Sequence, residues 1–301
     1  MSKKPALVIT GERKHKLVKI VDIDEDIVQT ATSLKNIVQF MELPIFSTAK
    51  KADTRIYEWS SPDGKKRFTI TPSAKGRATV WDRDILLFFF TSLAGMIDNG
   101  DLAKDFRVDF FSVTALAINR FCRRGDGGQD YDDLISAFDR LLGTVVKLEV
   151  EGESCVSFPL IAGYEVVKRD GSNRMSNVQV NLPAHILQLL FNRKTLSFSK
   201  TYQKLTSGYE KQLSMLCPRF CGNKSVFPIS LEKLWVWMGR PRELKTFRHW
   251  IRNRTGELME YSVIYLPSTD EVQINNNKIR EAKIRRYIKK RAIEKHKKRD
   301  Q

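Results

Sequence analysis

Apolar and basic residues alternate in the segment RPRELKTFRHWIRNR, residues 240–254, with the period of an α-helix. At about 100° per residue, three apolar side chains share one face: Leu244, Phe247 and Ile251. Four cations fall on the opposite face: Arg242, Lys245, Arg248 and Arg252. Pro241 suits the first turn of a helix, and Gly256 suits a left-handed cap just past its end. The pattern predicts an amphipathic helix of about four turns.

Hydrophobic periodicity predicts further elements before this helix. One helix is expected at 26–41 and another at 82–98. Between them, two strand-like stretches flank the turn sequence Ser-Pro-Asp-Gly, which predicts a hairpin over 56–72. Another hairpin and two more helices are expected at 163–182, 184–191 and 207–220.

One order of elements occurs twice along the chain. In the first copy, a strand at 106–110 and a helix at 112–121 precede a Gly-rich break, a helix at 131–142 and a two-stranded ribbon. In the second copy, a strand and a helix at 227–238 precede the amphipathic helix and a ribbon at 260–275. Helix, turn, helix and β-ribbon is the order of a winged helix. The sequence therefore predicts a duplicated architecture.

Net charge identifies the class of partner. The formal charge is +17 and the isoelectric point is near 9.7, which favours a polyanion, either nucleic acid or an anionic membrane surface. Between Lys278 and Arg299 there are twelve Lys or Arg and two Glu, so this tail is either a sequence-independent phosphate grip or a solvated terminus. No apolar run approaches the roughly 18 residues of a membrane helix, and the N-terminus lacks a secretory signal. We expect a cytoplasmic protein with no membrane partner.

The basic face of the amphipathic helix is the candidate DNA contact. The second helix of a winged helix enters the major groove, where Arg suits a bidentate contact with guanine and Lys anchors phosphate. The residues expected to contact double-stranded DNA are Arg240, Arg242, Lys245, Arg248, His249, Arg252 and Arg254, with Arg123 and Arg124 touching the backbone. A basic face that contacts only solvent is the alternative.

The second helix of the first copy is acidic. Asp132, Asp133 and Asp139 outnumber its single Arg140, and Asp130 stands just ahead of them. Carboxylates would repel phosphates in a groove, whereas acids near a helix start have an ordinary stabilising role. This copy is expected to serve protein–protein contact. A metal-binding nuclease cluster is the alternative.

Motifs for catalysis or metal binding are few. The four cysteines, Cys122, Cys155, Cys217 and Cys221, are too scattered for a disulfide framework. Reduced, partly buried thiols are favoured over a zinc site at Cys217 and Cys221. The stretch CGNKS fails the spacing of a phosphate-binding loop, and neither G-x-S-x-G nor H-E-x-x-H is present. We expect no enzymatic activity, no cofactor and no metal.

A string of motifs resembles one known family. LPIFS at 43–47 precedes ITPSAKGRATVWDRDIL at 70–86, in which ITPS-x-KG-x-AT and D-x-DIL are the most specific pieces. YDDLISAFDRLLGT at 131–144, PLIAGYEVVKRD at 159–170 and then FCG follow with order and spacing retained. In these motifs the chain resembles the plasmid replication initiator protein A family of bacteria.

The resemblance implies an initiator with two winged helices that binds repeated sites in a plasmid origin. It also implies opening of adjacent A·T-rich DNA, recruitment of host proteins such as DnaA and the replicative helicase, and a homodimer in equilibrium with the monomer. The second winged helix would make the main specific contact. Members of that family tend to carry fewer acids on the first copy's second helix. The alternatives are a transcriptional regulator with no replication role and an RNA-binding protein that uses the basic tail.

The expected fold class is α+β, with two tandem winged-helix domains and a basic C-terminal tail that is helical or disordered. The expected divisions are an N-terminal segment at 1–40, a first winged-helix domain at 41–165 for dimerisation and backbone contact, a second at 166–276 for specific DNA binding, and a tail at 277–301.

Overall fold

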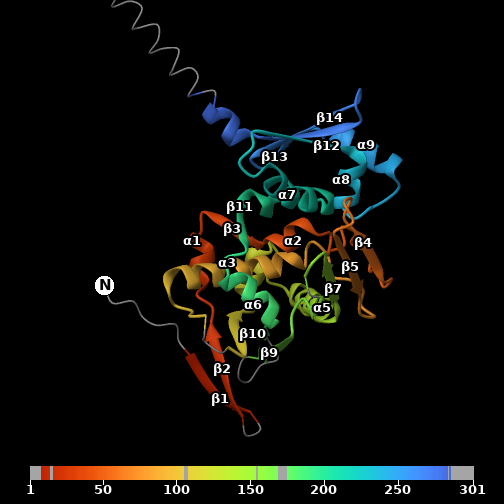
Figure 1. Cartoon of the computed structure of the whole chain (residues 1–301). Coiled ribbons are helices and arrows are strands. Elements are labelled where there is room, and N and C mark those ends of the chain that lie inside the picture. Colours follow the sequence, from red (N-terminus) through yellow and green to blue (C-terminus); the bar gives the residue numbers. More distant parts are fainter. Residues whose placement is uncertain are drawn as a thin grey trace, which may run out of the picture. The chain divides into compact units, whose positions relative to one another are not determined.

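The structure, a computed structural model, describes residues 8–13, 16–104, 108–153, 155–168, 175–283 and 285. Its contacts divide the chain into an N-terminal unit, Met1–Lys211, and a C-terminal unit, Gln212–Gln301. Each unit contains both helices and strands (Figure 1). The fold is therefore of the mixed α+β class.

A five-stranded sheet in the N-terminal unit joins segments that are far apart in the sequence. Its order is β1 (Val8–Arg13), β2 (Lys16–Asp22), β6 (Phe110–Thr114), β10 (Met175–Asn181) and β9 (Gly163–Lys168). Strands β2 and β6 pair in parallel, and the other neighbours are antiparallel. Two of these strands come from the region predicted to be a separate N-terminal segment.

The predicted hairpin and the predicted first ribbon form one antiparallel sheet. Its order is β4 (Tyr57–Ser60), β5 (Lys66–Thr71), β7 (Val145–Val150) and β8 (Val156–Pro159). On its inner face Trp59 stacks on Phe68, with ring centroids 5.1 Å apart. The ribbon of the first copy is thus the continuation of a larger sheet, because β7 pairs with β5 along its whole length.

The longest helix of the N-terminal unit is α3 (Arg83–Asn99), whose side chains are buried on nearly all sides. It ends at Gly100, whose φ of 81° provides the left-handed C-cap. After α3 come α4 (Ala115–Phe121), α5 (Gly128–Gly143), α6 (Ala184–Phe191), a 3₁₀ turn η1 (Lys200–Lys204) and the start of α7 (Gly208–Cys221).

Two local predictions in this unit are wrong. Residues 26–41 do not form one helix but α1 (Glu25–Thr30), β3 (Ser33–Ile37) and α2 (Val38–Glu42). Strand β3 pairs with β11 (Thr195–Ser199), and this distant partner overrides the local helical pattern. The helix predicted at 112–121 begins only at Ala115, because Phe110–Thr114 is strand β6 and the Thr114 side chain caps the helix.

The C-terminal unit follows the predicted order closely. After α7 come β12 (Val226–Ser230), α8 (Leu231–Trp237) and α9 (Leu244–Arg254). Three strands complete the unit: β13 (Gly256–Leu258), β14 (Tyr261–Leu266) and β15 (Glu271–Asn276). The sheet order is β12-β15-β14-β13, all antiparallel, so the strand before the two helices pairs with the ribbon that follows them.

The division between the units falls later than the predicted boundary at 165/166. Strand β10 pairs with β6, and β11 pairs with β3, so the chain up to Lys211 belongs with the first 165 residues. The separate segment predicted at 1–40 is also part of this unit, since β2 pairs with β6. Of the basic tail, residues 277–283 and 285 are helical, and the rest lies outside the described residues.

Candidate nucleic-acid interface

Helix α9 is shorter than its sequence pattern predicts. It begins at Leu244 with Glu243 as N-cap, so Pro241 lies before the helix and not in its first turn. The chain between α8 and α9 is held by the Trp235 indole, whose Nε1 donates to the Arg242 carbonyl at 2.7 Å. Gly256 does not cap the helix. With a φ of 143°, which other residues rarely adopt, it begins strand β13.

The two faces of α9 are divided as predicted. Phe247 and Ile251 are buried, and Trp250 stacks on Phe247 with ring centroids 5.6 Å apart. Five basic residues on the other side of the helix and just before it are exposed: Arg240, Arg242, Lys245, His249 and Arg252. The helix therefore packs with its apolar stripe and presents a basic surface to solvent.

Arg248 differs from the other cations of α9, because its guanidinium is bound by a carboxylate of its own protein. Its Nε and Nη2 donate to the two oxygens of Asp270 at 3.0 and 2.9 Å. The Tyr265 hydroxyl donates to the same carboxylate at 2.7 Å. Hydrogen bonds from Arg248 and Tyr265 hold the pKa of the Asp270 carboxyl below its usual value. A third of the Arg248 side chain stays exposed, so the pair lies at the surface.

The ribbon β14–β15 therefore shapes the basic surface. Asp270 comes from the turn before β15, and Tyr265 comes from β14. The Arg252 guanidinium lies over the Tyr265 ring at 5.7 Å. Both arginines were predicted from the sequence, but these two partners were not. The turn Pro-Ser-Thr-Asp was visible in the sequence, but which carboxylate would face the helix depends on how the ribbon folds back.

The two arginines that flank the helix, Arg240 and Arg254, are only partly available for contact with DNA. Arg254 is half-buried, and its Nη2 donates to the Glu257 carbonyl at 2.9 Å. Arg240 has a φ of 48°, and its guanidinium lies 5.6 Å from the centre of the Trp235 ring. Both side chains border the basic surface, but each is also in contact with its own protein.

Two carboxylates of the acidic helix α5, those of Asp130 and Asp139, bind groups of the protein itself. Asp130 accepts from the Gly125 and Gly127 amides at 3.0 and 2.9 Å, which is the ordinary role of an acid at a helix start. Asp139 is bound by Lys75 and by the Tyr164 hydroxyl. These bonds account for Asp130 and Asp139, whereas Asp132 and Asp133 are exposed.

Arg123 and Arg124 lie in the turn between α4 and α5. Arg123 is exposed with a φ of 57°, whereas Arg124 is half-buried. The Arg124 Nη1 is buried, and within the described part of the chain it has no hydrogen-bond partner. Arg123 is therefore the more accessible of the two candidates for backbone contact.

The most specific motif, WDRDIL, forms a buried charge cluster. Asp82 receives two bonds of 2.7 Å from Arg140 of α5. Asp84 accepts from the Lys211 ammonium at 2.7 Å and from the Tyr202 hydroxyl at 2.8 Å. The buried Arg83 donates to that hydroxyl and to the Lys211 carbonyl. The motif thus ties α3 to α5, η1 and α7, which is a structural role that the sequence alone did not reveal.

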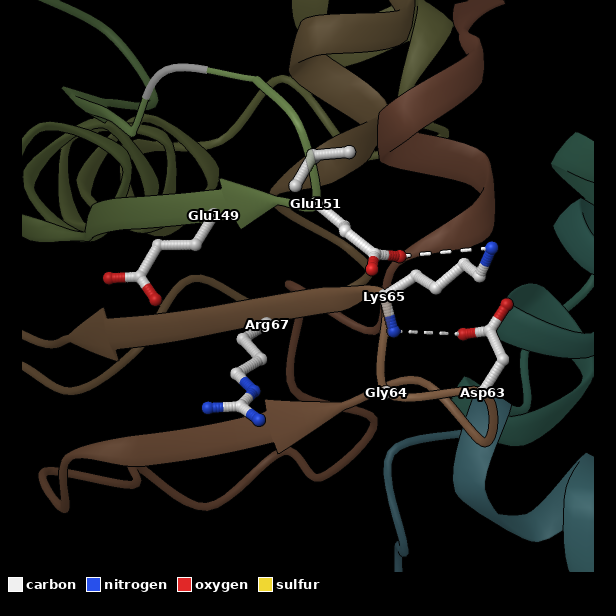
Figure 2. A pocket seen from close by; sticks show the side chains of 7 residues that line it. Asp63, Gly64, Lys65, Arg67, Glu149 and Glu151 are labelled. Atoms are coloured by element: carbon white, nitrogen blue, oxygen red, sulfur yellow. Dashed lines mark hydrogen bonds and ion pairs between the residues drawn. The ribbon is translucent and has the colours of Figure 1, made fainter.

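A hollow of about 450 Å³ lies at the β4–β5 turn of the N-terminal unit (Figure 2). The residues that line this hollow include two cations, Lys65 and Arg67, and three acids: Asp63, Glu149 and Glu151. The Lys65 ammonium is 3.7 Å from the Glu151 carboxylate, and the Lys65 amide donates to Asp63, as the dashed lines in Figure 2 mark. Because the lining carries both signs of charge, it does not favour the binding of a polyanion.

The described residues contain no cluster of three His, Cys, Asp or Glu side chains arranged to hold a metal ion. No helix in the described ranges has the length and apolar character needed to cross a bilayer.

Comparisons with known proteins agree with the sequence motifs. The profile of the family described as Replication initiator protein A matches residues 35–263. A protein of Wigglesworthia glossinidia brevipalpis named "Putative replication protein" is 28% identical over 267 residues, which cover 84% of this chain and 92% of that protein. The crystal structure of domains 2 and 3 of RctB matches with a TM-score of 0.56 at 15% identity, and the match covers 80% of this chain and 98% of that structure.

The likeness to RctB concerns the fold, which both chains share over most of their length. The family profile covers well over half of the present chain. It includes the motif around Asp84 and all of α9, and it ends within β14. The chain therefore belongs to the replication initiator protein A family, and its role is that of a replication initiator.

Proposed function

We propose that this chain starts replication of a plasmid by binding repeated duplex sites in the origin, with α9 in the major groove. The observation that carries the proposal is the division of α9, whose apolar stripe packs inside while Arg242, Lys245 and Arg252 are exposed. The order β12, α8, α9, β14, β15 is that of a winged helix, in which the second helix enters the groove. The protein acts without enzymatic chemistry in this proposal.

The exposed cations have different roles in the complex. Lys245 is a compact charge suited to a phosphate, whereas Arg242 and Arg252 carry planar guanidinium groups suited to the O6 and N7 atoms of guanine. Phosphate contacts set affinity and its dependence on salt, and base contacts set the choice of sequence. The N-terminal unit contributes backbone contact through Arg123 and dimerisation. DnaA and the replicative helicase remain the host partners that the resemblance implies.

The binding test uses repeats found beside the encoding gene and random duplexes of the same length. Fluorescence anisotropy is measured for both duplexes over a salt titration. The intact protein should prefer the repeat by a factor that survives as salt rises, because base contacts do not depend on counterion release. Arg252→Ala should reduce that preference, and Lys224→Ala is the control because Lys224 is an exposed cation before β12. Equal loss of specific and random binding in Arg252→Ala would contradict base recognition by α9.

A transcriptional regulator with the same DNA contacts is the second candidate, since α9 and its ribbon would serve either role. A plasmid whose maintenance depends on this gene and its flanking DNA separates the two. Replication that is lost with Arg252→Ala and kept with Lys224→Ala supports the initiator. Promoter repression without replication from the intact locus would support the regulator.

A further inference from the structure

We propose that Asp270 is a positioning residue for base recognition, which holds Arg248 so that the outer edge of its guanidinium faces a guanine in the major groove. The inference rests on the proposed function and adds a residue of the ribbon to the machinery that selects sequence. Arg248 would read the base, and Asp270 would act only through Arg248.

The geometry of the guanidinium allows Arg248 to bind Asp270 and a base at the same time. Arg248 binds Asp270 through Nε and Nη2, which form one edge of the planar group. Arginine has five N–H donors, and these two bonds use the Nε–H and one N–H of Nη2. The second N–H of Nη2 and an N–H of Nη1 form a second edge that faces away from Asp270. That second edge is the one that matches the O6 and N7 acceptors of guanine. The ion pair therefore occupies one edge of Arg248 and leaves the other edge for a base.

Asp270 is itself fixed from three sides, which makes it a rigid support. Its carbonyl accepts from the Leu231 amide, the first residue of α8, at 2.9 Å. Its side chain accepts from the Tyr265 hydroxyl of β14 at 2.7 Å and from Arg248 of α9. One residue thus connects both helices and the ribbon. A long side chain held at such a site loses less conformational freedom when it binds a base.

Exposure shows that the pair lies where a ligand can reach it. The side chains of Arg248 and Asp270 are 34% and 44% exposed. Arg252 lies over the ring of the same Tyr265, so the ribbon holds two adjacent cations of α9. An ion pair that served only stability would contribute little at such exposure.

A competing role for Asp270 makes the opposite prediction. If the carboxylate merely occupied Arg248 in place of a DNA phosphate, its removal would strengthen binding to every duplex. If it positions Arg248, its removal weakens recognition of one base and leaves the other positions unchanged. Asp270→Asn separates these outcomes, because it removes the charge while keeping the shape of the side chain.

The experiment selects duplexes from a random library with the full-length protein and then measures binding to single-base variants of the selected site. The intact protein should prefer guanine at one position by roughly 5- to 150-fold, the range of one bidentate contact. Asp270→Asn and Arg248→Lys should each lose most of that preference at the same position. The double variant should lose no more than either single one, because both changes remove one interaction.

Glu271→Gln is the matched control, since it removes the adjacent carboxylate of the same ribbon and should keep the preference. If Asp270→Asn folds poorly in a thermal melt, Tyr265→Phe removes only the hydroxyl that supports Asp270 and should reduce the preference at the same base. Asp270→Asn that keeps the full preference, or that tightens selected and random duplexes equally, overturns the inference. An intact protein without any base preference overturns the proposed function as well.

Discussion

The buried pair of Asp84 and Lys211 gives a prediction about the family motif that can be worked from the structure. The Lys211 ammonium donates to the Asp84 carboxylate at 2.7 Å, and the two side chains are 4% and 11% exposed. Arg83 is fully buried next to them. Changing Asp84 to Asn removes the carboxylate and leaves two buried cations in the cluster. Changing Lys211 to Met removes the ammonium and leaves the buried carboxylate.

The magnitude follows from the burial of the pair. Removing one partner of a buried ion pair costs about 3 to 5 kcal/mol, because the remaining charge is desolvated without compensation. Each single change should therefore lower the free energy of unfolding by that amount. The combined variant, Asp84→Asn with Lys211→Met, removes both charges at once. We expect it to be less destabilised than the sum of the single variants by about 2 to 3 kcal/mol.

Hydrogen exchange at increasing denaturant measures the loss of stability around the buried pair. Peptides from α3 report the opening free energy around Asp84, and peptides from β14 and β15 serve as an internal reference. Lys147→Met removes one partner of the exposed pair with Glu149 and should change exchange very little. A loss below about 1 kcal/mol for both single variants, or strictly additive losses, would refute the assignment of a structural role to this motif.

Three further predictions concern single side chains. Lys245→Ala should reduce the slope of log affinity against log salt by about 1 on any duplex, as expected for one lost phosphate contact, and an unchanged slope would exclude that contact. Cys155 is exposed and should react first with a thiol reagent, whereas burial raises the pKa of Cys221 to about 11 and that of Cys217 well above its usual value. Early labelling of Cys217 or Cys221 in the folded protein would contradict their burial. The lowered pKa of Asp270 means that its pair with Arg248 stabilises the fold above the ordinary carboxyl pKa of about 3.9 and that this contribution is lost as the pH falls below it. Because the pair is exposed, the difference in melting temperature between the intact protein and Asp270→Asn should be small at neutral pH and vanish in strong acid, and a difference that persists there would contradict this origin.

Elements held by local interactions were predictable from the sequence. The hairpin β4–β5 was visible from its Ser-Pro-Asp-Gly turn, and α3 from its long apolar stretch. In the C-terminal unit, β12, α8, α9 and the ribbon follow one another along the chain, so the predicted order needed no distant partner. The faces of α9 followed from its helical period alone.

Elements that depend on distant pairing were not predictable in the same way. The segment with Leu34 has a helical pattern, but it becomes strand β3 because β11 pairs with it across about 160 residues of sequence. The division after Lys211 has the same cause, since β9 and β10 join β6 in one sheet. Local periodicity carries no information on which strands will pair.

The candidate site shows the same limit. The cations of α9 were identified from their spacing, whereas Asp270 is 22 residues away from Arg248 and faces it only after the ribbon folds back. The acids of α5 were expected to serve protein–protein contact. In the structure Asp139 pairs with Lys75, 64 residues earlier in the chain. Composition alone does not predict which opposite charges will form an ion pair in the folded chain.

Methylation interference at guanine N7 tests the central claim most directly, because it asks whether α9 reads bases in the major groove. A repeat from the origin is methylated sparsely, and bound and unbound duplexes are compared for the intact protein, Arg252→Ala and Lys224→Ala. The account predicts that methylation of a few guanines blocks binding by the intact protein and by Lys224→Ala, and that Arg252→Ala becomes insensitive at one of them. Binding that ignores methylation of every guanine, or the same pattern of interference in all three proteins, would contradict it.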